Sequence, residues 1–121
     1  MNKTILAVDD SKTMRDMINF TLAEAGFKVL LAEDGNGALQ VLAGNTVDLV
    51  ITDVNMPGMN GIDLVKGIRA DARLRALPVL ILTTEAGEDV KQKGRAAGAT
   101  GWIVKPFQPD KLLKVVEKVC A

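Results

Sequence analysis

The chain has 121 residues and a mass of 12.9 kDa, which is enough for one compact domain and too little for two. It contains no histidine and one cysteine, which excludes histidine-liganded metal sites, Ser-His-Asp triads, cysteine zinc clusters and a disulfide framework. Fifteen basic and fifteen acidic residues cancel, and three Phe with one Trp make no stacking platform, so we expect no binding to nucleic acid. The first apolar run, residues 5–8, is too short for a signal peptide and no later run reaches spanning length. We therefore expect a cytoplasmic protein that does not bind membranes.

Short runs rich in Val, Ile and Leu alternate along the chain with longer amphipathic stretches. Each run is nearly continuous, which is typical of strands covered on both faces in a parallel sheet. We therefore predict five buried strands, over residues 5–8, 29–32, 47–51, 79–82 and 102–104.

The amphipathic stretches between the runs predict helices. Apolar residues recur at helical spacing, and Gly26 follows where a C-terminal glycine cap is expected. These residues are Met14, Met17, Ile18, Leu22 and Ala25. Phe20 falls off this apolar stripe, and we expect it to be partly exposed. The predicted helices cover residues 12–25, 35–43, 61–70 and 87–97, with a last one after Pro109 whose apolar stripe includes Cys120.

The stretch over residues 87–97 differs from the other predicted helices. Val90 is its single large apolar residue, and glycine interrupts it. We expect it to be the least stable helix.

Five β-α repeats with right-handed crossovers make a doubly wound α/β fold, a five-stranded parallel sheet with helices on both faces. We expect the strand order 2-1-3-4-5 of flavodoxin-like proteins, an order taken from known folds. The prediction is a single domain over residues 1–121 with no output domain.

Polar side chains end four of the five predicted strands. Asp9 and Asp10 follow the first strand, Asp53 the third, Thr83 the fourth and Lys105 the last. In a parallel α/β sheet ligands bind at the carboxyl ends of the strands, and neighbouring strands lie about 4.8 Å apart. We therefore expect these five side chains to form one cluster.

Three carboxylates in one small patch repel one another, by about 1 kcal/mol per pair in water and about 4 kcal/mol at an effective dielectric constant of 20. A divalent cation offsets this repulsion, and Mg²⁺ suits one or two carboxylates combined with a phosphate and water. Carboxylates also serve as nucleophiles in phosphoryl transfer. Asp53, central in the cluster, is the predicted phosphoryl acceptor.

Taken singly, each residue has an ordinary structural interpretation. Asp10 or Ser11 could cap the helix that follows, and Thr83 could cap another. Asp53 could belong to the turn that follows it, and Lys105 could be a solvated charge. The functional interpretation depends on their coincidence at one edge of the sheet.

Four segments of the chain form recognisable motifs: VDDS at residues 8–11, Asp53 with NMPGMNG at 55–61, LT at 82–83 and GWIVKPF at 101–107. Together they resemble the receiver domain of two-component response regulators, and in particular stand-alone chemotaxis regulators of the CheY type. The resemblance spans the whole chain in order.

The resemblance implies that Asp53 accepts a phosphoryl group from the phosphohistidine of a sensor histidine kinase, in a reaction that needs Mg²⁺. Asp10 and Asp53 would hold the ion directly, Asn55 through its backbone carbonyl, and Asp9 through water. The Lys105 ammonium would pair with the phosphoryl oxygens, and the family's Lys-Pro bond after this strand is cis.

The resemblance also implies a switch. The Thr83 hydroxyl would bond to a phosphoryl oxygen, and Trp102 stands where the family has its switch aromatic, usually Tyr or Phe. The surface of helix 87–97, the last strand and the last helix would then bind a target such as the flagellar motor switch. The alternative for Trp102 is permanent packing against the last helix.

Asn55 and Glu85 would flank the phosphoryl group and tune its lifetime, with spontaneous decay and a possible phosphatase. Such a protein is a signalling switch and not an enzyme, and we expect a monomer.

Other functions fit less well. A haloacid dehalogenase-type phosphatase needs a second Asp where Asn55 stands, and it needs a cap insertion. A nucleotide-binding loop at Gly35 and Gly37 lacks its third glycine, which Gln40 replaces, and follows the wrong strand. A complete acidic pocket disfavours a non-signalling pseudo-receiver. A phosphate sink, which competes for phosphoryl groups without binding a motor, stays open.

Overall fold

Five parallel strands alternate with five helices in the computed structural model, which describes residues 3–56, 58–84 and 88–120. The strands are β1 (Thr4–Val8), β2 (Lys28–Ala32), β3 (Leu49–Asp53), β4 (Val79–Thr83) and β5 (Gly101–Val104). The helices are α1 (Lys12–Glu24), α2 (Gly35–Gly44), α3 (Gly61–Ala70), α4 (Glu88–Ala97) and α5 (Pro109–Cys120), with a short 3-10 helix η1 (Ala72–Leu74) that was not predicted. The sheet order is β2-β1-β3-β4-β5, which confirms the predicted fold class.

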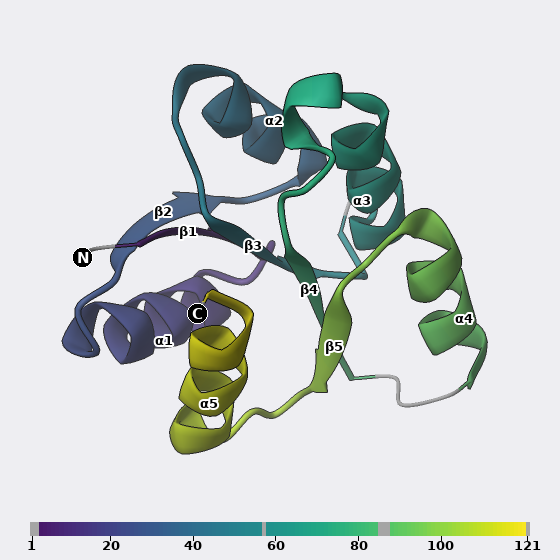
Figure 1. Ribbon diagram of the computed structural model, residues 1–121. Helices are drawn as coiled ribbons and strands as arrows, with labels where there is room; N and C mark the ends of the chain where they lie inside the picture. Colours follow the sequence, from purple (N-terminus) through teal and green to yellow (C-terminus); the bar gives the residue numbers. More distant parts are fainter. Residues whose placement is uncertain (1–2, 57, 85–87, 121) are drawn as a thin grey trace.

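The helices cover both faces of the sheet (Figure 1). Helices α1 and α5 lie on one face, and α2, α3 and α4 lie on the other. Each face has its own hydrophobic cluster: Ile18 and Leu112 lie in the first, and Leu42 and Ile68 in the second. Within the described part of the chain, no helix is both long enough and apolar enough to cross a membrane.

Strand β3 begins two residues later than predicted and includes Asp53. Val47 lies in the preceding loop, where the Asp48 carboxylate accepts a hydrogen bond from the Thr4 amide at 2.8 Å. Pairing with β1 starts at Leu49, so register and not hydrophobicity sets the first residue of the strand. Thr52 is polar yet fully buried, with its hydroxyl donating to the Asp53 carbonyl at 3.0 Å.

The prediction of five buried strands is wrong for the two edge strands. β1, β3 and β4 are almost completely buried, whereas Leu31 on β2 and Val104 on β5 are 38% and 43% exposed. An edge strand has one neighbour and is covered less completely by the helices, so a continuous apolar run does not require burial on both faces.

Helix ends follow local capping. The Ser11 hydroxyl accepts from the Met14 amide at 3.2 Å and begins α1, and Gly26 ends it with a φ of +96°. This φ is a conformation that favours glycine, so the predicted glycine cap is confirmed. Helix α5 includes Pro109 and does not start after it, because proline fits the first helical position.

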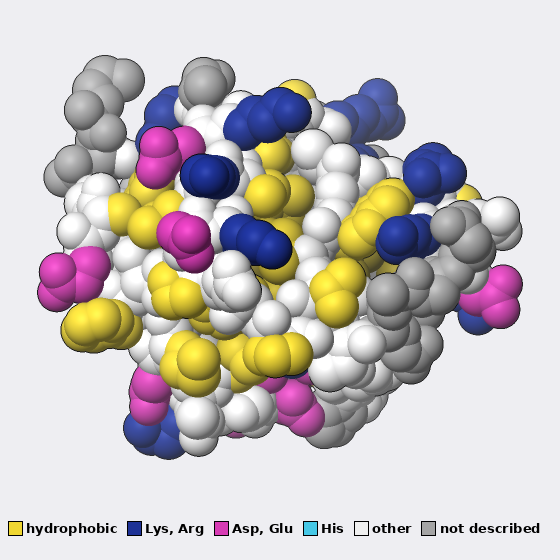
Figure 2. All heavy atoms as spheres, turned by 90° about the horizontal axis from the view of Figure 1, so that it is seen from below, with side chains coloured by type: hydrophobic (Ala, Val, Ile, Leu, Met, Phe, Trp, Pro, Cys, Tyr) yellow, Lys and Arg dark blue, Asp and Glu magenta, His cyan; other side chains and the backbone are white. Residues whose placement is uncertain are grey.

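Large apolar side chains of α1 remain in solvent. Met17 is 45% exposed, although its spacing placed it on the predicted apolar stripe, and Phe20 is 69% exposed, as predicted. Seen from the side of α1 and α5, hydrophobic side chains are interspersed with charged ones (Figure 2). Single exposed hydrophobic residues of this kind are ordinary on protein surfaces.

Arg69 on α3 connects the loops at the ends of α3 and α4. Its Nε donates to the Gly98 carbonyl at 3.0 Å, and its Nη1 donates to the carbonyls of Leu77 at 2.6 Å and Leu74 at 3.3 Å. Gly98 follows α4 with a φ of +103°. A hydrogen bond therefore connects the residue after α4 to α3. Burial of the Arg69 guanidinium lowers its pKa.

Candidate functional site

The carboxyl edge of the sheet brings together the acidic residues that end β1 and β3. These strands pair directly, with Val8 opposite Thr52. Asp9 is fully buried, Asp53 is 6% exposed, and Asp10 faces solvent. One carboxylate oxygen from each of the three lies within 4.8 Å of the others. The strand ends thus form the acidic cluster that the sequence predicts.

Lys105 reaches this cluster from the end of β5. Its Nζ lies 3.0 Å from Asp9 Oδ2 and 3.3 Å from Asp53 Oδ1, and its side chain is 12% exposed. Its backbone amide donates to the Thr83 carbonyl at 2.7 Å, and the peptide bond to Pro106 is cis. Lys105 is therefore an internal cation bound to two carboxylates, which rules out the solvated-charge interpretation.

The electrostatics of the cluster favour binding a further positive charge. Burial raises the pKa of Asp53, and the Asp9 charge raises it further, while Lys105 opposes both effects. For Lys105, burial acts to lower the pKa, but the hydrogen bond to Asp9 and the charges of Asp53 and Asp9 outweigh it, and the net pKa is raised. One ammonium faces three carboxylates, so the cluster retains an excess of negative charge.

The backbone around Asp9 is fixed by two hydrogen bonds. Asp9 Oδ1 accepts from the Ser11 amide at 2.9 Å, and Arg15 Nη1 donates to the Asp9 carbonyl at 2.6 Å. Because Ser11 caps α1, the interpretation of Asp10 as the helix cap is wrong. Within the described residues, the Asp10 side chain makes no hydrogen bond or ion pair.

Gly61 positions the strand end that carries Asp53. Its amide donates to the Val54 carbonyl at 2.9 Å, and a Cβ at this position would collide with the Asp53 carbonyl oxygen. From the sequence, Gly61 was predicted only to begin a helix and to end the NMPGMNG motif. The sequence signal for this role is a glycine directly after the Asn60 cap, because the start of α3 packs against the backbone at the end of β3.

Thr83 ends β4, next to Asp53, and is 2% exposed. Helix α4 begins at Glu88, and residues 85–87 between it and Thr83 lie outside the described part of the chain, so the alternative that Thr83 caps this helix stays a prediction. Asn55 is exposed shortly after β3, and Glu85 lies outside the described residues.

Trp102 lies on the face of the sheet that carries α4. Its half-buried side chain packs against the hydrophobic cluster of that face, and Lys91 and Arg95 of α4 lie over its ring. The alternative that places Trp102 against the last helix is wrong, because β5 directs alternate side chains to opposite faces and Ile103 packs on the α5 side.

The acidic cluster fits Mg²⁺ in donor type and spacing. Mg²⁺ prefers carboxylate, carbonyl and water oxygens at about 2.1 Å, so two ligands of one ion are at most about 4.2 Å apart. The three carboxylate oxygens lie within 4.8 Å of one another, so adjustments of less than about 1 Å would suffice.

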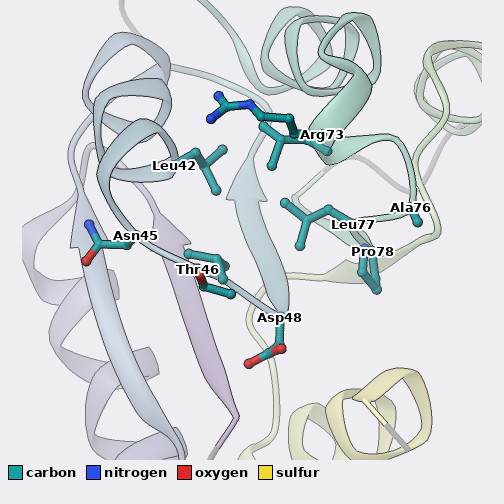
Figure 3. A pocket seen from close by; sticks show the side chains of 10 residues that line it. Leu42, Asn45, Thr46, Asp48, Arg73, Ala76, Leu77 and Pro78 are labelled. Carbon is teal, nitrogen blue, oxygen red and sulfur yellow. The ribbon is translucent and has the colours of Figure 1, made fainter.

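A hollow at the opposite end of the sheet holds none of the predicted site residues (Figure 3). It lies between the α2–β3 loop and the η1–β4 loop, with Leu42 and Leu77 among its lining. Its charged side chains already have partners: Asp48 accepts from Thr4, and Arg73 pairs with Asp71 at 3.0 Å. The residues predicted to form the functional site lie instead at the carboxyl edge of the sheet.

A doubly wound sheet with acidic residues, a threonine and a lysine at the carboxyl ends of its strands is the arrangement of a receiver domain. The response regulator receiver domain model matches residues 5–117, and the chain belongs to this family.

Several relatives of this chain are named chemotaxis proteins. Chemotaxis protein CheY of Pseudomonas aeruginosa is 46% identical over 116 residues, which are 95% of this chain and 94% of that protein. Chemotaxis protein CheY-3 of Vibrio cholerae is 45% identical over 119 residues, covering 98% and 92%. The structure of chemotaxis response regulator CheY4 of Vibrio cholerae matches with a TM-score of 0.94 at 45% identity, covering 98% of this chain and 99% of that one.

Proposed function

We propose that this protein is a phosphorylation-activated chemotaxis response regulator that acts in the cytoplasm through its receiver domain. Asp53 accepts a phosphoryl group from the phosphohistidine of a sensor histidine kinase, in a reaction that depends on Mg²⁺. The observation that carries the proposal is the Lys105 ammonium, held between Asp9 and Asp53 at 3.0 and 3.3 Å. The names of the relatives support the assignment to chemotaxis.

The transfer is a displacement at phosphorus. An Asp53 carboxylate oxygen attacks, the P–O bond forms, and the P–N bond to the donor imidazole breaks with its electron pair going to nitrogen. Such reactions need mainly positioning and charge neutralisation. Lys105 exchanges its contact with the Asp53 carboxylate for one with the phosphoryl oxygens, and the Thr83 hydroxyl donates to another oxygen.

Bound Mg²⁺ supplies neutralising charge for the acyl phosphate and the acidic pair. Asp10 and Asp53 would hold it directly, Asn55 through its carbonyl and Asp9 through water. Asp10 suits this role because its carboxylate is exposed and has no partner among the described residues.

The phosphorylated state is transient in this proposal. Asn55 is exposed next to the acceptor and leaves a path for water, and Asn55 and Glu85 tune the rate of hydrolysis. A phosphatase would shorten the lifetime further. The protein catalyses only its own phosphorylation and dephosphorylation and is otherwise a switch.

Output passes through Thr83 and Trp102 to the surface of α4, β5 and α5. Movement of the Thr83 hydroxyl toward the phosphoryl group would leave space beside β4, which Trp102 fills by turning inward. The monomer then binds its target, such as the flagellar motor switch.

The test is phosphorylation by a small phosphodonor such as acetyl phosphate with Mg²⁺. Intact-mass analysis should show one hydroxylamine-sensitive phosphoryl group, and Asp53→Asn should show none. Asp63→Asn, which removes an exposed carboxylate from α3, is the matched control and should be labelled normally. Stoichiometric labelling of Asp53→Asn would refute the acceptor assignment.

A phosphate sink is the second candidate function. Beryllofluoride-loaded protein distinguishes the two, because a regulator should bind a motor-switch protein more tightly when loaded. Equal, weak binding with and without beryllofluoride would favour the sink.

A further inference from the structure

The ring of Trp102 lies beneath two cations of α4. Lys91 Nζ is 5.3 Å from the ring centroid, and the Arg95 guanidinium carbon is 5.4 Å from it. Both distances are within the range of about 6 Å over which a cation is attracted to an aromatic face, and each such contact at an exposed site changes an equilibrium by about 2- to 5-fold. We call Lys91 and Arg95 over this ring the cation clamp.

The arrangement brings together charges that would otherwise repel. Residues four apart lie on the same face of a helix, where like charges are unfavourable. The negative face of the indole offsets that repulsion, so both cations gain from lying over one ring.

Gly94 brings the helix close enough for these contacts. A Cβ at this position would lie 2.9 Å from Ile81 Cδ1, so glycine allows this approach of α4 to β4 without displacing the end of the Ile81 side chain. Ile81 is the register partner of Trp102 on the neighbouring strand. The close approach therefore places the helix face that carries Lys91 and Arg95 directly beside the ring.

We propose that the cation clamp holds Trp102 in its resting position and sets the threshold for switching. A ring that turns inward leaves both cations, so the clamp lowers the population of the inward state by about 5- to 30-fold if the two contacts add. A ligand that selects a minor state binds more weakly in proportion to that population. The proposal rests on the proposed function because the inward state is the phosphorylated one, and Lys91 and Arg95 are positioning residues that act through Trp102.

The test compares Lys91→Met and Arg95→Met, singly and combined, with the parent. Methionine keeps an unbranched apolar stem while it removes the charge. Lys91→Arg and Arg95→Lys restore a cation and should restore parental behaviour. Lys93→Met is the matched control, because Lys93 is an exposed lysine on the same helix that is not over the ring.

The first measurement is the indole N–H resonance of the only tryptophan, without ligand. It should move in the double methionine variant, return in the double variant with exchanged cations, and stay in place in Lys93→Met. The second is the beryllofluoride concentration at half-saturation in Mg²⁺, which should fall about 5-fold or more in the double methionine variant. Loss of a positive charge alone weakens anion binding, so Lys93→Met should leave this midpoint unchanged or raise it.

An unmoved indole resonance, an unchanged or higher midpoint in the double methionine variant, or an equal fall in Lys93→Met would each overturn the proposal. If the parent binds no beryllofluoride in Mg²⁺, the proposed function fails. The indole resonance then still decides whether the clamp holds the ring.

Discussion

The ammonium of Lys105 lies 3.0 Å from the Asp9 carboxylate, whose side chain is 1% exposed, so a buried ion pair connects the end of β5 to the end of β1. Removing one partner of such a pair leaves a buried, uncompensated charge. Lys105→Met should therefore lower the free energy of unfolding in EDTA by about 3 kcal/mol, measured by urea denaturation. Mg²⁺ should recover part of the loss, because it supplies the missing positive charge.

Lys12→Met is the control for this prediction. Lys12 pairs with Asp16 at 2.8 Å, but both side chains are largely exposed, and the change should cost less than about 0.5 kcal/mol. A similar loss in the two variants would show that the burial of the Lys105 pair has no energetic consequence.

Asp53→Asn should stabilise the metal-free protein. Burial and the neighbouring Asp9 charge raise the pKa of Asp53, so its ionised form is unfavourable in the folded state despite Lys105. Removing the charge should raise the free energy of unfolding in EDTA by about 1 kcal/mol, and should weaken Mg²⁺ binding. Asp10→Ala should also weaken Mg²⁺ binding, but with little change in EDTA because solvent already screens Asp10. A lower melting temperature for Asp53→Asn in EDTA would contradict the argument.

Gly61→Ala should be strongly destabilising because the added methyl group meets the Asp53 carbonyl. We expect a loss of about 2–3 kcal/mol and slower phosphorylation by acetyl phosphate, since the strand end that carries the acceptor must shift. Gly44→Ala is the comparison. A Cβ there meets nothing within 4 Å, and alanine is the better helix former, so stability should be unchanged or slightly higher. Equal stabilities of the two variants would argue against close packing at Gly61.

The fold and the acidic cluster could be predicted because their signals are local in the sequence. Continuous apolar runs mark strands, and in a parallel sheet every carboxyl end lies at one edge, so Asp9, Asp53 and Lys105 meet without knowledge of distant contacts. The start of β3 could not be predicted, because Asp48 and Thr4 set it across the sheet. The exposure of the edge strands likewise depends on strand order and not on composition.

Other residues escaped prediction because their roles come from close approach. Gly61 and Gly94 resemble ordinary helix glycines in the sequence. The structure shows that a methyl group at Gly61 would meet the Asp53 backbone, and that one at Gly94 would have to displace the end of the Ile81 side chain. Arg69 resembles a surface arginine in the sequence, but in the structure it donates hydrogen bonds to the backbone carbonyls of three residues, Leu74, Leu77 and Gly98. The face occupied by Trp102 follows from the alternation of side chains on β5, and the predicted apolar run of three residues did not show which of them faces which side.

Cys120 should react slowly with thiol reagents. It is half-buried at the end of α5, whereas its place in the apolar stripe predicted a core residue. Burial raises the pKa of its thiol, the charge of Asp48 raises this pKa further, and the charge of Lys3 lowers it. A raised pKa means less thiolate at a given pH, so iodoacetamide alkylation should be slower than in urea and should continue to rise with pH beyond the range of a free cysteine. Equal rates in native and unfolded protein would contradict this.

The hydrogen bond from Arg69 to the Gly98 carbonyl gives α4 a fixed end. The helix has ten residues and is about 15 Å long, so a rotation of about 5° around its tethered end moves its first turn by about 1 Å and its last turn hardly at all. Helix α4 is in this sense a lever with its pivot on α3. Because the first turn is the end that lies after β4 and Thr83 in the chain, a displacement there would diminish along the helix toward Gly98, and the contact with α3 would keep the rest of the domain in place.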